Sequence, residues 1–151
     1  MRLLVDTNII IDCLRKRHPH DKSASLLIGL GKLGEFELWI SPSQMGDAFY
    51  LLTDGGKKSL AHAVYEELQD IRKAVKVCQF GESEVDNALA SGWPDFEDAL
   101  VHEAARFLKA DALITRNQKD FEKSAVPVFD CDEFFDWFAE EHGVHYAEIA
   151  L

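Results

Sequence analysis

Two carboxylates follow short apolar segments that are far apart in this chain. Asp6 comes directly after Arg2–Val5, and Asp120 comes five residues after the close of Ala112–Thr115. Both segments are short apolar runs followed by helical or turn sequence, as expected of buried strands. Functional residues of open α/β sheets gather outside the carboxyl ends of the strands. The sequence therefore predicts that Asp6 and Asp120 lie together at one edge of a sheet.

Two further acids are predicted on helices that leave the same edge. Asp47 follows the strand-like Glu37–Ile40. Asp98 lies near the start of the helix that precedes the strand-like Ala112–Thr115. Both have mainly apolar or small neighbours, where an unpaired charge is costly. Carboxylates that face one another in this way repel unless a cation lies between them. Mg²⁺ and Mn²⁺, which prefer oxygen ligands, are the ions that suit such a site.

The chemistry of this ligand set is phosphodiester hydrolysis. Metal ions held by carboxylates polarise a phosphate oxygen, activate a water and stabilise the leaving oxygen, so no protein nucleophile is needed. The chain contains no GxSxG, GxxxxGK[ST] or HExxH motif that would indicate another chemistry.

Taken singly, each acid also has a structural explanation. Asp6 is suited to cap a helix, and Asp47 could lie on an exposed face. Asp95, Glu97 and Asp98 could merely favour the positive end of a helix dipole, and Asp120 could be an ordinary loop carboxylate. Only the joint pattern favours a site.

The elements that must position these acids alternate between strand and helix. Strands are predicted at residues 2–5, 37–40, 75–78 and 112–115, with a short fifth at 126–129. Helices are predicted at residues 9–17, 21–30, 42–52, 60–71, 82–90, 96–108 and 133–141. Thr7 or Asn8 is expected to cap the first helix, and Gly31 and Gly34 to close the second. The prediction is one α/β domain over residues 1–141, with a mainly parallel sheet of four or five strands flanked by about seven helices, and a tail of uncertain structure over 142–151.

Composition is that of a globular protein, with 47% hydrophobic and 28% charged residues. No apolar run approaches the roughly 18–20 residues of a membrane span, and Asp6 interrupts any signal peptide, so a cytoplasmic protein is expected. Cys13, Cys78 and Cys131 form no CxxC pair and are expected to be buried and reduced. The net charge is −11, and 17 of the 27 acidic residues follow Phe80. This balance excludes binding of nucleic acid mainly by basic residues, unless metal ions offset the acidic face.

Three segments resemble the PIN-domain family. Arg2–Asn8 resembles the opening of these domains, where a strand ends in Asp-Thr-Asn. Asp95–Leu100 resembles the segment that holds their third acid, and Ala112–Phe121 resembles their closing strand and turn. With the helix that carries Asp47, the resemblance covers roughly residues 1 to 135.

The resemblance implies particular site residues. It makes Asp6, Asp47, Asp98 and Asp120 the catalytic, metal-binding acids; the second acid is commonly Glu in this family, so the contact of the shorter Asp47 with the metal is expected to pass through water. Either Asp95 or Asp98 could point inward, and Asp98 is favoured because Ala and Leu follow it. The expected supporting residues are Asn8, Asp95, Thr115 and Asn117. The expected substrate-binding residues are Arg15, Arg116 and Lys119.

The resemblance also implies a function. PIN-domain enzymes are metal-dependent ribonucleases, and many small ones are toxins of toxin–antitoxin pairs. The expected partners are therefore RNA, an antitoxin protein and a second copy of the chain. The alternative is an inactive PIN-like module that binds RNA or a protein, which Asp47 in place of Glu favours. A haloacid dehalogenase-like phosphatase is disfavoured, because it needs an Asp where Asn8 stands.

His102 and the aromatic residues near the C-terminus also have structural explanations. His102 lies four residues after Asp98 but is interpreted as a packing residue rather than a ligand. Phe134, Trp137 and Phe138 have the spacing of one buried helix face. Other aromatics nearby are expected in the core, at a homodimer surface or in an antitoxin groove.

Overall fold

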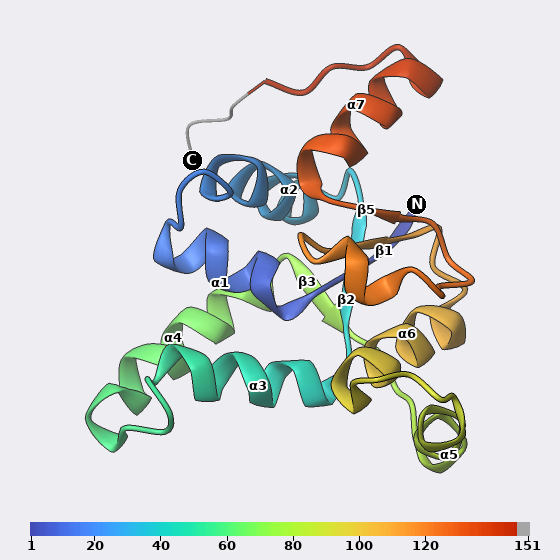
Figure 1. Ribbon diagram of the computed structural model, residues 1–151. Coiled ribbons are helices and arrows are strands. Elements are labelled where there is room, and N and C mark those ends of the chain that lie inside the picture. The colour runs from blue at the N-terminus through green and yellow to red at the C-terminus, as the bar shows by residue number, and fades with distance from the viewer. Residues whose placement is uncertain (148–151) are drawn as a thin grey trace.

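The computed structural model describes residues 1–147, which form a three-layer α/β/α domain built on a five-stranded sheet (Figure 1). All strand pairs are parallel, and the spatial order is β3-β2-β1-β4-β5. The strands are β1 (Arg2–Val5), β2 (Glu37–Ile40), β3 (Val75–Val77), β4 (Ala112–Ile114) and β5 (Val128–Phe129). The predicted α/β class and the short fifth strand are confirmed.

The central strands are buried on both faces, as parallel sheets require. Along β1, Leu3 and Val5 belong to the core on one face, whereas Leu4 belongs to the core on the other. All three side chains are fully buried. This is why the strand preceding Asp6 is a continuous apolar run rather than an alternating one.

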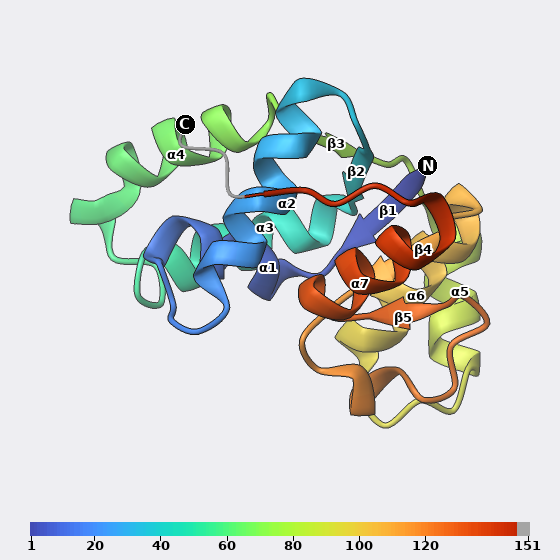
Figure 2. The ribbon, with the colours of Figure 1, turned by 90° about the horizontal axis from the view of Figure 1, so that it is seen from above.

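Within residues 1–147, seven α-helices surround the sheet. They are α1 (Thr7–Arg15), α2 (Asp21–Leu33), α3 (Pro42–Leu52), α4 (Ala61–Ile71), α5 (Glu82–Ala90), α6 (Phe96–Leu108) and α7 (Cys131–His142). Helices α1, α2 and α7 share one core with the sheet, and α6 packs on the opposite face (Figure 2). Helices α3 and α4 extend away from the sheet, with a small core of their own against α1 (Figure 1).

Several helix boundaries differ from the sequence prediction, including the start of α1 and the end of α2. Helix α1 begins at Thr7, because Asp6 rather than Thr7 or Asn8 is its N-cap. Helix α2 continues through Gly31, where a Cβ would lie 2.6 Å from Leu38 Cδ1, so this glycine serves close packing instead of ending the helix. Gly34 at φ +79° closes it.

The C-terminal aromatic residues form core, as expected. Phe36 makes edge contacts with Phe134, Phe138 and Tyr146 at centroid distances of 5.2 to 5.7 Å. Tyr146 lies in the predicted tail and packs on the domain, so the division after residue 141 stays a prediction. Residues 148–151 of that tail lie outside the described part.

The three cysteines within residues 1–147 are free, and Cys13 is less buried than expected. Cys78 and Cys131 are buried and free, and Cys13 is free and half-buried. None of the helices described is long and apolar enough to cross a membrane.

Candidate active site

The acids lie near the topological switch point of the sheet, between β1 and β4. Strands β1 and β4 are neighbours, but β2 follows on one side and β5 on the other. The Asp6 N–H donates to the Ile114 carbonyl at 2.8 Å, which places Asp6 and Thr115 side by side at the strand ends. Such a switch point is where open α/β sheets bind their ligands.

Asp6 is held by two hydrogen bonds. The Thr115 hydroxyl donates to Asp6 Oδ2 and the Thr7 N–H donates to Oδ1, both at 2.7 Å. Burial nevertheless raises the pKa of Asp6, and the nearby Asp120 adds to the rise; the two hydrogen bonds and the Arg116 charge oppose it. The predicted supporting role of Thr115 therefore corresponds to a direct contact with the central carboxylate.

Replacement of Thr115 by valine is expected to raise the pKa of Asp6 further. Valine is similar in shape but cannot donate to Oδ2, and a hydrogen bond to a charged group is worth about 1.5–3 kcal/mol. Carbon-detected NMR titration of the Asp6 carboxyl would measure the change. Thr115→Ser keeps the hydroxyl and serves as the control. An unchanged Asp6 titration in the valine variant would contradict this account.

Asp98 lies half-buried in the first turn of α6. Its N–H donates to Oδ1 of Asp95 at 3.1 Å, so Asp95 is the exposed N-cap of the helix and Asp98 is the more enclosed of the two acids. Burial raises the pKa of Asp98 to about 6, with repulsion from Asp95, Asp120 and Asp6 adding to the effect. Asp98 is thus electrostatically coupled to both strand-end acids.

Asp120 is carried by a 3₁₀ turn, η2 (Gln118–Phe121), which follows β4. The Asn117 N–H donates to the Thr115 hydroxyl at 3.1 Å, and the Asp120 N–H donates to the Asn117 carbonyl at 3.0 Å. Asn117 supports the turn through its backbone, and its side chain is exposed. A hollow of about 190 Å³ between α6 and this turn is lined by both Asp98 and Asp120, with Lys119 and Lys123 beside them.

Asp47 is positioned by the start of α3. Ser41 and Gln44 form a capping box, and Gln44 Nε2 donates to the Val5 carbonyl at 2.7 Å. This buried amide ties α3 to the end of β1, directly before Asp6. Asp47 is half-buried, and burial raises its pKa. Sequence analysis missed Gln44, although Ser followed by Gln three residues later is a helix-start signal.

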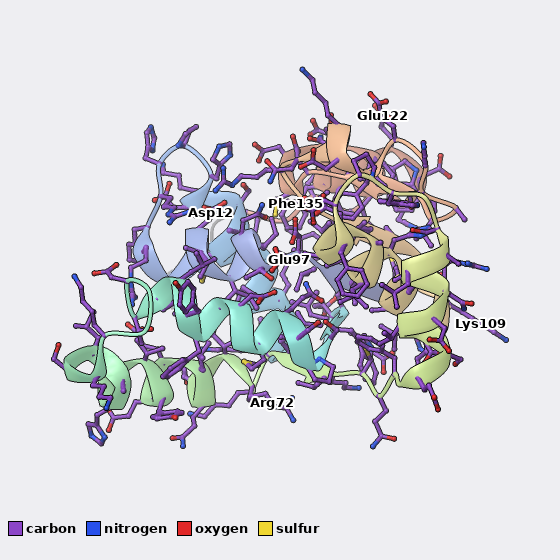
Figure 3. All side chains as sticks on the ribbon, turned by 60° about the horizontal axis from the view of Figure 1, so that its bottom comes forward. Asp12, Arg72, Glu97, Lys109, Glu122 and Phe135 are labelled. Atoms are coloured by element: carbon purple, nitrogen blue, oxygen red, sulfur yellow. The ribbon has the colours of Figure 1, made fainter. Side chains whose placement is uncertain are left out.

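Glu97, an exposed residue next to Asp98 on α6, also lies near the acids, which the sequence did not indicate. Figure 3 shows Glu97 between α1, α3 and α6. The charge of Asp47 is the largest cause of the raised pKa of Glu97, followed by burial, Asp95 and Asp6. The tertiary structure therefore places this residue near Asp47 and Asp6, although it was interpreted only as a helix-dipole partner.

The predicted basic residues separate into two groups. Lys119 borders the hollow with the acids, whereas Arg15 lies at the far end of α1 and binds Glu67 with two contacts of 2.9 and 3.0 Å. Arg116 Nε lies 2.9 Å from Oδ2 of Asp12, which is fully buried. The N–H direction does not meet hydrogen-bond geometry, so this contact is an ion pair. A contact of Arg116 with RNA stays a prediction.

His102 packs as the sequence predicted. Its Nε2 accepts a hydrogen bond from the Ala125 N–H at 3.1 Å, and its ring stacks on Trp93 at 4.7 Å. Burial lowers the pKa of His102. A ring held in this way acts in packing.

These acidic side chains suit a hard divalent ion, because each of them has carboxylate oxygens that can bind it. Oδ1 of Asn8, two residues after Asp6, is buried and has no hydrogen-bond partner among residues 1–147. As they stand, however, no three acidic, histidine or cysteine side chains within residues 1–147 are close enough to form a metal-binding group.

Comparison with known proteins agrees with this geometry. The PIN domain family matches residues 2–119, which is most of the chain. The chain belongs to the PIN domain family. The Aquifex aeolicus protein ribonuclease VapC1 is 26% identical over 141 residues, which are 88% of this chain and 92% of that protein.

Solved structures share the PIN fold. Rickettsia felis VapBC2, solved with a DNA fragment from its promoter, aligns with a TM-score of 0.65 at 18% identity, over 86% of this chain and 98% of that one. A toxin–antitoxin complex from Klebsiella pneumoniae aligns with a TM-score of 0.57 at 21% identity, over 85% and 97%. At these identities the likeness establishes the fold of this chain.

Proposed function

We propose that this PIN-domain chain is an endoribonuclease that hydrolyses RNA with Mg²⁺ or Mn²⁺ and serves as the toxin of a toxin–antitoxin pair. The observation that carries the proposal is the placement of Asp6, Asp98 and Asp120 around the switch point between β1 and β4. A relative named as a ribonuclease, alignable over 88% of the chain, supports RNA as the substrate.

The residues present fit a divalent ion. Asp98 is half-buried, and burial together with repulsion from nearby carboxylates raises its pKa, which is the situation that a cation relieves. The buried, unpaired Oδ1 of Asn8 is a further oxygen close in sequence to Asp6. When bound, the ion would polarise the phosphate and lower the pKa of a water. Asp6, Asp98 and Asp120 would hold it, with Asp47 acting through water.

The chain's own residues prepare this chemistry. Thr115 holds one oxygen of Asp6, and Asp95 fixes the first turn of α6 that presents Asp98. Lys119 and Lys123 border the hollow beside the acids, where a negatively charged RNA backbone would approach. Asp95, Asp98, Asp120 and Glu122 line the same hollow, so this pair of lysines and the metal charge together would offset the local negative charge where phosphate must bind.

The antitoxin partner is proposed from the solved PIN structures in such complexes. A gene for a small protein directly beside the gene for this chain, whose product binds and inhibits it, would support this role.

RNA cleavage tests the proposal. Purified protein would be incubated with single-stranded and hairpin RNAs in Mg²⁺ or Mn²⁺, with EDTA as the control for metal. We expect defined cleavage products that disappear when EDTA is added. Failure to cut any RNA in either metal would favour the alternative, an inactive PIN-like module that binds RNA or a protein and in which Asp47 replaces the usual glutamate.

A further inference from the structure

We propose that Trp93 binds one unpaired base of the RNA by stacking, next to the place where the phosphate is cut. This inference rests on the proposed function and deepens it, because it assigns a base-binding subsite for the same RNA substrate. The flat face of a base would lie on the indole ring, while the charged side chains of the same hollow bind the phosphate and its metal ion.

The hollow that is lined by Asp98 and Asp120 is also lined by an aromatic ring. Trp93 and Pro94, in the loop between α5 and α6, border it together with these two acids (Figure 1). Its volume is about 190 Å³, below the roughly 300–1,000 Å³ of pockets that enclose drug-sized ligands. A space of this size beside an indole suits a single base, because every base has a flat face that stacks on aromatic rings.

The Trp93 ring is held in place from within the protein. It stacks on His102 at a centroid distance of 4.7 Å and makes an edge contact with Phe121 at 5.7 Å. The backbone is held too, because Ser91 Oγ accepts the Trp93 N–H at 3.2 Å. Trp93 is nevertheless only half-buried, so the surface that His102 leaves uncovered is accessible from the hollow. A ring ordered in advance loses little conformational freedom when a base binds.

The surroundings of Trp93 favour a base of single-stranded RNA. Lys119 and Lys123 line the same hollow and supply positive charge for the phosphates that adjoin the base. A base within a duplex is covered by its neighbours, so only an unpaired segment can place one on Trp93. Stacking depends on the ring rather than on the edges of the base, so we expect little preference among the four bases.

A packing role alone for Trp93 is distinguishable from this one. Trp93 packs against the core that includes Phe121, so its loss could simply disturb the site. Trp93→Leu keeps an apolar side chain there but lacks the flat ring, whereas Trp93→Phe keeps a ring. A disturbed site would bind RNA less well whether or not the RNA carries bases. A lost stacking contact would affect only RNA that carries them.

Binding measured by fluorescence anisotropy with two labelled probes tests the proposal. One is oligouridylate of about ten nucleotides, and the other is a ribose-phosphate chain of the same length and charge without bases. Ca²⁺, which also prefers oxygen ligands, replaces Mg²⁺, and gel electrophoresis verifies that the RNA is intact when binding is measured. We expect Trp93→Leu to weaken binding of oligouridylate about fivefold or more, the lower end of the cost of losing one stacked base, and to leave binding of the baseless chain unchanged. Trp93→Phe should keep most of the preference for bases, and Lys123→Gln, the control for phosphate binding, should weaken both probes equally.

The outcomes separate this inference from the function on which it rests. Wild-type protein that binds neither probe would overturn RNA as the ligand, and the base-binding subsite with it. Equal binding of both probes by the wild type would overturn the subsite and leave the proposed nuclease intact. A preference for oligouridylate that persists in Trp93→Leu would overturn the role of Trp93. Equal weakening of both probes in that variant would also overturn it, because Trp93 would then act in packing alone.

Discussion

Replacement of Asp98 by asparagine is expected to abolish RNA cleavage while making the metal-free protein more stable. Loss of the carboxylate should lower cleavage at least about a hundredfold, because a direct ligand matters more than the outer partners whose loss costs about 10–100-fold. The stability gain arises because Asp98 is half-buried, and this burial, together with repulsion from the neighbouring acids, raises its pKa to about 6. Asparagine fills the same space without the charge.

The pH dependence of this gain follows from the raised pKa. A carboxyl whose pKa is higher in the folded state stabilises the fold while protonated and loses this contribution as pH rises through the folded value. The variant should therefore be more stable to unfolding than the wild type above about pH 6, the folded pKa of Asp98. Below about pH 4 the two proteins should be equally stable. After allowance for solvent screening, the difference at pH 8 should be about 1–2 kcal/mol, or roughly 3–6 °C in Tm.

Thermal unfolding in EDTA and in Mn²⁺ would check this expectation. Mn²⁺ should raise the Tm of the wild type more than that of the variant, because the ion neutralises the same repulsion. Asp86→Asn, which removes an exposed carboxylate from α5, is the control and should show neither effect. A variant less stable than the wild type in EDTA at pH 8 would contradict the electrostatic account of Asp98.

Replacement of Arg116 by methionine is expected to destabilise the protein by roughly 2–4 kcal/mol at pH 7. Arg116 is the ion-pair partner of Asp12, whose carboxylate is fully buried and accepts no hydrogen bond. Removing one member of a buried pair leaves an uncompensated charge, which typically costs 3–5 kcal/mol. The Arg116 side chain is 29% exposed, so the lower part of that range applies. Chemical denaturation with urea would measure the loss.

The double variant Asp12→Asn, Arg116→Met is the control for this interpretation. It removes both charges, so much of the lost stability should return. If the double variant is no more stable than Arg116→Met alone, the ion pair is not the cause. RNA cleavage by the double variant would also show whether Arg116 contacts RNA, because this activity could then be measured without a folding defect.

The sequence alone determined the strands and the positions of the main acids. β1 and β4 are short apolar runs whose backbone must be buried, so Asp6 and Thr115 had to stand at strand ends. The Asp6-Thr7-Asn8 run and the acid-rich start of α6 resembled the PIN-domain family, which the match over residues 2–119 confirmed. Local signals of this kind are readable because they depend on neighbours within one strand or one helical turn.

Only the tertiary structure decided which residues share the site and which are used elsewhere. Gln44 joins α3 to β1 across 39 residues, and Arg116 pairs with Asp12 rather than standing free. Glu97 lies near Asp47 only because the fold brings α3 and α6 to the same edge of the sheet. These contacts depend on the packing of helices on an open parallel sheet, so no periodicity or spacing along the chain could have shown them.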